Sequence, residues 1–408
     1  MTRRLAYLVP EFPGQTHVWI WREMVHMKAW GVRTQVFSTR PPTERDRARH
    51  AFAKEATDAT SYLWPAAWGE TVGALAWAAF SRPAALLACL WLVLTLPIDR
   101  GPRWKKSWPL ILPACILSRR LERGGYTHVH SHSCASSAVL CMLARRLAGV
   151  TYSLTLNANI EWWGGAMDRK FGEARFVIAI TRWLLEQCRR DFPSLDDRFH
   201  LGRIGVDTQK WDPARARRNR GDDAWRIVNV GRLHPSKGLD VLIKAVALLR
   251  AAGRPVDLRL IGAGPWREDL ERLAGSLQLS DHVRFEGSLS EDRIIEELAN
   301  ADVFVLPSLA EPLGVVVMEA MALGVPTIGT RAGGVGEIID DGTDGVLVPP
   351  SDTSALAGAI ERLMTDHHRR ETLARSGRER IVREFDSRIG AATLHQLVFG
   401  VGPEGTRE

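Results

Sequence analysis

Cysteine is scarce in this chain. The 408 residues include five cysteines, all before residue 200, and no two of them form a Cys-x-x-C pair. An odd number without such pairs argues against a disulfide framework and against a structural zinc site. The opening MTRRLAYLVPEFPG has only a short apolar run, which is not typical of a signal peptide. We therefore expect reduced, mostly buried thiols in a cytoplasmic protein.

The chain also lacks an apolar run long enough to cross a bilayer. Ala84–Leu96 is a thirteen-residue apolar stretch bounded by Pro83 and Pro97, whereas a spanning helix needs about 20 residues. The stretch is either a buried core helix or a helix lying in the membrane interface, anchored by flanking basic residues and tryptophans. The candidate anchors are Trp91, Trp104 and Trp108.

Acidic residues are few in the first half. Residues 1–200 contain 27 Lys and Arg against 16 Asp and Glu, whereas residues 201–408 contain 27 against 31. A basic half can meet nucleic acid, an anionic membrane or a phosphorylated substrate. Because no nucleic-acid-binding module is recognisable, we expect no nucleic acid partner. We expect peripheral contact of the basic, Trp-rich first half with the inner face of the cell membrane.

The order of apolar segments predicts an α/β protein with two domains. Short strands alternate with amphipathic helices up to about residue 181, and the alternation restarts at residue 226 after a stretch rich in Gly, Asp and Arg. We predict domains at 1–205 and 226–385, a linker at 206–225, and a helical tail at 386–408 that packs on the first domain. Both domains are predicted to be doubly wound, with ligands at the carboxyl ends of the strands.

Loops that follow strands of the second half contain cations and glycines. In VGRLHPSKG, Arg232 and Lys237 can bind a diphosphate, since Arg offers a planar fork and Lys a point charge. Alternatively, both are solvated loop residues. In LIGAGP, Gly262 and Gly264 permit close approach of a ligand or form a tight turn. In RFEGSLS, Gly287–Leu289 could offer backbone groups to a flat base.

Two acids flank the start of a predicted helix in EPLGVVVMEAMALG. Glu311 precedes a helix that we expect to begin near residues 312–314, and Glu319 lies inside it. The free N–H groups of such a helix start attract an anion. The acids would then point past the anion toward hydroxyl groups, such as those of sugar rings. Alternatively, Glu319 lies on the wet face of the helix and Glu311 favours its dipole.

Together these motifs resemble the nucleotide-sugar domain of retaining glycosyltransferases of the GT-B fold, family 4. The resemblance is continuous over residues 226–352. It implies two Rossmann-like domains facing a central cleft, and a metal-independent enzyme without a cofactor that uses a nucleoside diphosphate sugar as donor. It implies that Glu311 binds hydroxyls of the transferred sugar and Glu319 the ribose, while the loops at Gly262, Gly264 and Gly287–Leu289 meet the base side of the donor. The implied diphosphate-binding residues are Arg232, Lys237, Gly314, Val315 and Val316.

The first half resembles family members that build exopolysaccharides. The segments that carry this resemblance are YLVPEFPGQTHVWIWREM, VHSH, SLTLNANIEWW, FVIAITRW and RIGVDTQKW. The first half departs from the family at one position that the resemblance associates with the reacting sugar. Asn157-Ala158 replaces a common His-Gly pair. Asn can donate and accept hydrogen bonds but cannot change charge near neutral pH. The exchange marks either a subfamily with its own donor preference or a reduced activity.

Three histidines alternate in THVHSH, so that His128, His130 and His132 would share one face of a strand. Such an arrangement suits a tetrahedral zinc site poorly, and no nearby Cys or acid completes one, so we predict no metal. His132, with Gly14, is predicted to line the acceptor side of the cleft. His17 is either the base that deprotonates the acceptor or a polar residue of the cleft.

The sequence therefore predicts a retaining glycosyltransferase that moves a sugar from a nucleoside diphosphate to an acceptor hydroxyl. The preferred acceptor is a polyprenyl-diphosphate-linked glycan in exopolysaccharide assembly. Two alternatives stay open at this point. One is a phosphorylase-type or epimerase-type enzyme on the same fold, and the other is a non-catalytic scaffold that binds nucleotide sugar.

Overall fold

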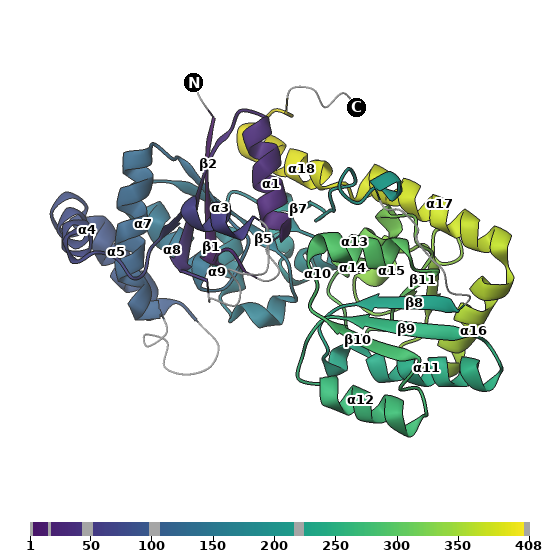
Figure 1. Ribbon diagram of the computed structural model, residues 1–408. Helices are drawn as coiled ribbons and strands as arrows, with labels where there is room; N and C mark the ends of the chain where they lie inside the picture. Colours follow the sequence, from purple (N-terminus) through teal and green to yellow (C-terminus); the bar gives the residue numbers. More distant parts are fainter. Residues whose placement is uncertain (1–2, 15–17, 43–51, 98–106, 216–223, 404–408) are drawn as a thin grey trace. The chain divides into compact units, whose positions relative to one another are not determined.

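The computed structural model describes residues 3–14, 18–42, 52–97, 107–215 and 224–403. The chain forms two compact units. The first comprises residues 1–204 together with 390–408, and the second comprises residues 205–389. Each unit contains one parallel sheet with helices on its faces (Figure 1), so the predicted pair of doubly wound α/β sheets is confirmed. His17 and Trp104 lie outside the described residues.

The first unit is built on a seven-stranded sheet in the order β3-β2-β1-β4-β5-β6-β7. Its strands are β1 (Arg4–Glu11), β2 (Arg33–Arg40), β3 (Thr60–Tyr62), β4 (His128–Ser131), β5 (Thr151–Leu156), β6 (Val177–Ala179) and β7 (Phe199–Leu201). Its helices are α1 (Val18–Ala29), α3 (Ala53–Asp58), α4 (Trp68–Ser81), α5 (Pro83–Thr95), α7 (Ile111–Gly124), α8 (Ser136–Ala148), α9 (Met167–Gly172) and α10 (Arg182–Asp191). The strand order reverses between β1 and β4, which pair in parallel with Tyr7 opposite His130.

Alternation along β1 divides the core of this unit. Leu5, Tyr7 and Val9 belong to a cluster that also contains residues of α1 and of the C-terminal helix α18 (Ser387–Phe399). Residues between them point to the opposite face, because successive strand side chains alternate. Arg175 donates to the Val398 carbonyl at 2.9 Å. Residues from 390 onward thus complete the first unit after the chain has formed the second.

The second unit has a six-stranded sheet in the order β10-β9-β8-β11-β12-β13. Its strands are β8 (Trp225–Val230), β9 (Val256–Ile261), β10 (Val283–Gly287), β11 (Val303–Leu306), β12 (Thr327–Thr330) and β13 (Val346–Val348). Its helices are α11 (Leu239–Ala251), α12 (Arg267–Ser276), α13 (Glu291–Ala299), α14 (Val315–Ala322), α15 (Val335–Ile338), α16 (Thr353–Thr365) and α17 (His367–Glu384). Here the order reverses between β8 and β11, and every ladder is parallel.

The stretch assigned above to a linker has a described part, residues 206–215, that belongs to the second unit. Val206 pairs with Asp386 as an isolated parallel bridge, and Trp211 is buried. Gly205 packs against the backbone of Phe385 with no room for a side chain, because an added Cβ would lie 2.3 Å from the Phe385 carbonyl oxygen.

The apolar stretch around residues 84–96 forms α5, which begins at Pro83 and ends at Thr95. Cys89, Leu92 and Val93 are buried, but Leu87, Trp91 and Leu94 are exposed. The alternative of a buried core helix is therefore wrong for the outer half of α5. Among the described residues, no single helix is long and apolar enough to cross a membrane. Only α4 and α5 taken together pass that test, and they are bent by 106°.

Candidate functional site

The loops that follow β8 and β11 lie side by side at the point where the strand order of the second sheet reverses. Ligands of doubly wound sheets bind at such a switch point. The Leu309 N–H donates to the Ser236 carbonyl at 2.9 Å. Gly238 has φ +59°, and a Cβ there would lie 2.2 Å from the Pro307 carbonyl oxygen. Glycine at this position therefore lets the two loops close on each other.

This closure brings together two residues that are 74 positions apart in sequence. The Lys237 ammonium forms an ion pair with Glu311 Oε2, and the Ser308 hydroxyl donates to the same oxygen at 3.2 Å. Both charged side chains are largely shielded, with exposed fractions of 18% for Lys237 and 9% for Glu311. Solvent screens a shielded pair less than a surface pair, and removing one partner would leave the other charge buried without a counter-charge. Arg232 lies in the β8 loop with an exposed side chain.

The start of α14 adjoins Glu311. The helix begins at Val315, after Gly314 with φ +86°, and so starts slightly later than expected. The first N–H groups of a helix have no intrahelical partner, so Val315 and Val316 offer donors for an anion. Both side chains are half-buried. Glu319 is the fifth residue of the helix and is also half-buried.

Gly262 and Gly264 allow the loop after β9 to pack closely against the loop after β8. A Cβ on Gly262 would lie 1.8 Å from the Gly231 carbonyl oxygen, and one on Gly264 would lie 2.1 Å from that of Leu233. The Gly262 N–H donates to the Gly287 carbonyl at 2.8 Å, so the loops after β8, β9 and β10 are joined. Leu289 follows, with a half-buried side chain. These contacts explain the glycines at 262 and 264 whether or not a ligand is near.

Two further glycines, Gly333 and Gly334, pack against the backbone of the loop that carries Glu311. A Cβ on Gly333 would lie 2.1 Å from the Glu311 carbonyl oxygen, and one on Gly334 would lie 2.3 Å from that of Pro312. The Gly334 N–H donates to the Glu311 carbonyl at 2.9 Å. The backbone that carries Glu311 is thus fixed between the loops after β8 and β12.

In the first unit, the histidines of β4 form a buried ladder with hydroxyl groups of β5. His128 contacts Thr151 at 2.7 Å and Ser153 at 2.8 Å. His130 contacts Ser153 at 2.7 Å and Thr155 at 2.9 Å. Burial lowers the pKa of His128 to about 3 and that of His130 well below its usual value. Both imidazoles therefore stay neutral and link the two strands.

His132 lies just beyond β4 and contacts an acid that sequence reasoning missed. Its Nε2 is 3.1 Å from Glu23 Oε1, a residue of α1. Burial raises the pKa of Glu23 to about 7 and lowers that of His132 to about 3. The prediction that no acid lies near the three histidines is therefore wrong, because α1 packs over the end of β4 and carries Glu23 there. One signal was present: Glu23 is the only acid in an otherwise apolar and basic helix.

Glu23, His130 and His132 are residue types that bind metals, and their ligand atoms lie within 4.8 Å of one another. Both nitrogens of His130 already contact hydroxyl groups. The group therefore fits a hydrogen-bonded polar cluster better than a metal site.

Asn157 belongs to the same region of the first unit. Its side-chain amide donates to the His132 carbonyl at 3.2 Å. Gly14 is buried after the end of β1. Because β1 and β4 are neighbours at the reversal of strand order, the segments that follow them lie at the switch point of this sheet. His17 falls outside the described residues, so its predicted role stays a prediction.

Comparison with known proteins bears on both units. Residues 212–380 match the family model of glycosyl transferases group 1. The chain is 30% identical over 314 residues to a GDP-mannose-dependent alpha-(1-6)-phosphatidylinositol monomannoside mannosyltransferase of Mycolicibacterium smegmatis, covering 71% of this chain and 82% of that protein. The chain belongs to the group 1 glycosyl transferases. It is thus a nucleotide-sugar-dependent enzyme of a retaining family, as the sequence motifs predicted.

One further sequence relative and one solved structure are similar to this glycosyltransferase. It is 34% identical over 179 residues to the putative colanic acid biosynthesis glycosyltransferase WcaL of Salmonella typhimurium, which covers 42% of this chain and 44% of WcaL. The structure of Anabaena HepE in complex with UDP matches with a TM-score of 0.72 at 16% identity, covering 98% of this chain and all of that one. The second likeness supports the GT-B fold alone.

Proposed function

We propose that this glycosyltransferase moves a sugar from a nucleoside diphosphate onto a hydroxyl of a lipid-linked glycan during exopolysaccharide assembly at the inner face of the cell membrane. The relatives support this choice by their names. One acts on a phosphatidylinositol-linked mannoside, and another is assigned to colanic acid. The basic excess of residues 1–200 also favours an acceptor carried in an anionic membrane.

The observation that carries the proposal is the Lys237–Glu311 pair beside the start of α14. A leaving diphosphate gains negative charge as the glycosidic bond breaks, and preorganised cations and N–H groups stabilise that charge. Lys237, Arg232 and the backbone of Val315–Val316 would serve there. Glu311, held by Lys237 and Ser308, would accept hydrogen bonds from hydroxyls of the transferred sugar. Glu319, further along α14, would bind the ribose.

The acceptor side would belong to the first unit. His132 is neutral and its Nδ1 atom is buried without a hydrogen-bond partner among the described residues. Glu23 can hold the imidazole by accepting from Nε2, which leaves a lone pair on Nδ1. Asn157 fixes the backbone of the same residue. These contacts support a positioning role for His132, whose lowered pKa makes it a weak base, and a role for Asn157 that requires no change of charge.

The test begins with the donor. Thermal shifts with UDP, GDP and ADP sugars should identify one nucleotide that stabilises the protein, and that donor should then label a lipid extract. Lys237→Ala and Glu311→Ala should each lower kcat/KM by about 10-fold to 100-fold, since a contact to a charged group contributes about 1.5–3 kcal/mol. Lys244→Ala is the matched control, because Lys244 pairs with Asp240 on the exposed side of α11.

Three results would contradict the proposal. One is that no nucleotide sugar shifts the melting temperature. Another is sugar release or epimerisation that proceeds equally well without an acceptor, which would favour the epimerase or phosphorylase alternative. The third is donor binding without any transfer, which would favour a scaffold and direct attention to Asn157.

A further inference from the structure

Large apolar side chains are exposed on one helical pair of the first unit. α4 exposes Trp68, Val72 and Leu75, and α5 exposes Leu87, Trp91 and Leu94. We call these six residues the α4–α5 face. Trp68 is 84% exposed and Trp91 is 70% exposed. The surface of a soluble protein rarely exposes several large apolar side chains on neighbouring helices, so these residues mark a binding surface.

The spacing shows that the exposure is organised. In each helix the three residues follow one another at intervals of four and then three positions, which places them along one side. The opposite sides are buried, through Ala74 and Ala78 of α4 and through Cys89, Leu92 and Val93 of α5. Each helix therefore has an inner face that packs on the unit and an outer face that is equally apolar.

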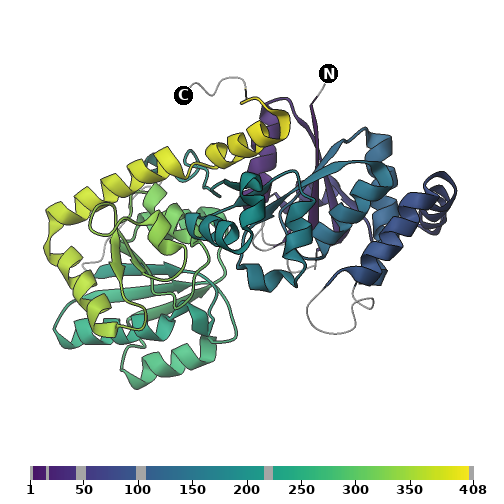
Figure 2. The ribbon, with the colours of Figure 1, turned by 180° about the vertical axis from the view of Figure 1, so that it is seen from behind.

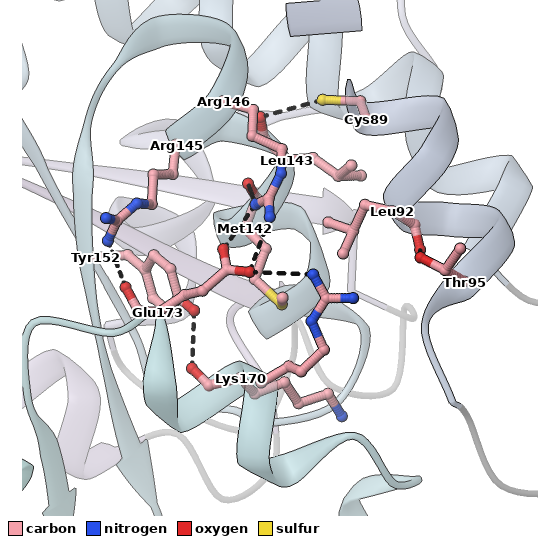
Figure 3. A network of polar contacts seen from close by, with 11 residues as sticks. Cys89, Leu92, Thr95, Met142, Leu143, Arg145, Arg146, Tyr152, Lys170 and Glu173 are labelled. Carbon is pink, nitrogen blue, oxygen red and sulfur yellow. Dashed lines mark hydrogen bonds and ion pairs between the residues drawn. The ribbon is translucent and has the colours of Figure 1, made fainter. Parts of the chain in front are cut away.

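The inner faces are anchored by specific contacts. The Cys89 thiol donates to the Leu143 carbonyl of α8 at 3.6 Å (Figure 3). α8 is itself held by a two-pronged pair between Arg146 and Glu173, at 2.7 and 2.8 Å. The Thr95 hydroxyl donates to the Trp91 carbonyl at 2.8 Å, so it needs no water. The Cys89 contact and the burial of Leu92 and Val93 hold α5 on the unit, which argues against a helix that leaves it to cross a bilayer.

α4 is fixed in a similar way. Glu70 is the only charged residue of α4, and it accepts two hydrogen bonds of 2.7 Å from Arg120 of α7. α5 contains no charged residue. Both views of the ribbon show the pair at the periphery of the first unit, in dark blue (Figures 1 and 2). The outer surface of the two helices is thus uncharged over its whole length.

Cations and aromatic rings border this surface. Arg82 lies at the junction of the two helices and pairs with Glu122, while Arg123 is exposed at the end of α7. Phe80 at the junction is 87% exposed, and Trp64 and Trp108 are exposed before α4 and after α5. Tryptophan and arginine at the rim of an apolar surface match the interface of an anionic bilayer, where rings sit among headgroups and cations meet phosphate.

We propose that the α4–α5 face inserts into the interfacial layer of an anionic phospholipid membrane, with both helices lying along the surface. The apolar side chains enter the boundary between headgroups and acyl chains, and the arginines bind lipid phosphates. The inference deepens the proposed use of a lipid-linked acceptor, since it names the surface that brings the enzyme to that acceptor. A second copy of the chain is the alternative occupant, and the test below separates the two.

The first experiment is sedimentation with vesicles of phosphatidylcholine, with and without phosphatidylglycerol. We expect the wild type to bind the anionic vesicles and to retain part of the binding in 0.5 M salt, where screening leaves the apolar contribution. The triple variant Trp68→Ser, Phe80→Ser, Trp91→Ser should bind about tenfold more weakly or worse. Leu248→Ser in α11, which also removes an exposed apolar side chain, is the control and should bind normally. Melting curves check that the variants fold.

A second experiment reads insertion directly. All five native cysteines are buried, so a polarity-sensitive dye reacts with an introduced one. A dye at Ala88→Cys on the exposed side of α5 should move to a less polar environment when anionic vesicles are added, whereas one at Ser276→Cys in α12 should not.

The inference is overturned if the wild type ignores anionic vesicles, or if the triple variant binds them as well as the wild type does. It is also overturned if the wild type is a dimer in ultracentrifugation and the triple variant a monomer, with no vesicle binding by either. The donor-induced melting shift should be unchanged in the triple variant. A wild type that binds anionic vesicles but shows no donor-induced melting shift would count against the proposed function and leave this inference intact.

Discussion

Glu23 illustrates how much of the first unit depends on single side chains. Its carboxyl group extends from α1 and contacts His132, just beyond β4. Burial favours the neutral forms of Glu23, His130 and His132. The Glu23 pKa of about 7 places its charge change within the physiological range. The other titratable groups that face it are His26, His130 and Tyr7.

We predict that Glu23→Gln alters the pH dependence of stability. The folded pKa of Glu23 is about 7, and its unfolded value is about 4.3, so the stability that its proton contributes is present at low pH and lost as pH rises through 7. Between pH 6 and 8 this loss is about 1 kcal/mol in the wild type. In Glu23→Gln the decrease measured by urea unfolding should be smaller by that amount.

The pH profile of sugar transfer gives a second readout for the same variant. If Glu23 positions His132 for the acceptor, kcat/KM of the variant should fall and its dependence on pH near 7 should flatten. An unchanged pH slope of stability would contradict the raised pKa. A changed slope with a normal transfer profile would limit Glu23 to a structural role.

At the scale of elements, the sequence predicted most of the strands that build the two sheets. Their apolar alternation and the loops that follow them are local signals. β3, β7 and β13 were not predicted, because each has only three residues; β6 is equally short but lies within the longer apolar run FVIAI. The Lys237 and Glu311 motifs were found because they follow regular strands. Glu23 could not be placed, since its contact depends on how α1 packs against β4.

The GGVGE stretch allows a comparison of two neighbouring glycines. Gly334→Ala places a Cβ 2.3 Å from the Pro312 carbonyl oxygen, whereas Gly336→Ala, inside α15, meets nothing within 4 Å. We predict that Gly334→Ala lowers the free energy of unfolding by about 1–3 kcal/mol. Gly336→Ala should be neutral or raise it by up to about 1 kcal/mol, because Ala favours the helix.

Urea unfolding measures both variants, and donor titration adds a functional readout. Gly334→Ala should also weaken donor binding, because the displaced loop carries Glu311. Equal stability of the two variants would mean that the loop yields without cost, and would remove the argument that these glycines fix Glu311.

For the whole molecule, the buried thiols report on how rarely the first unit opens. Burial raises the pKa of Cys89 and Cys188 to about 12 and that of Cys115 to about 11, and it also raises those of Cys134 and Cys141. The thiolate is the reactive form, so native thiols should react with a disulfide reagent at pH 8 about a thousandfold more slowly than in urea. After unfolding, all five should react. A thiol that reacts rapidly in the native protein would contradict this burial.

The return of the chain at α18 has a consequence for biosynthesis. Leu394 and Val398 share a core cluster with Leu5 and Tyr7, at opposite ends of the sequence. A ribosome therefore makes the first strand early but cannot supply its last packing partners until residues near 400 emerge. During translation the second unit can fold as soon as residue 389 is free, whereas the first unit must wait. Nascent chains stopped before α18 should for this reason expose the apolar cluster around β1 and α1 to chaperones.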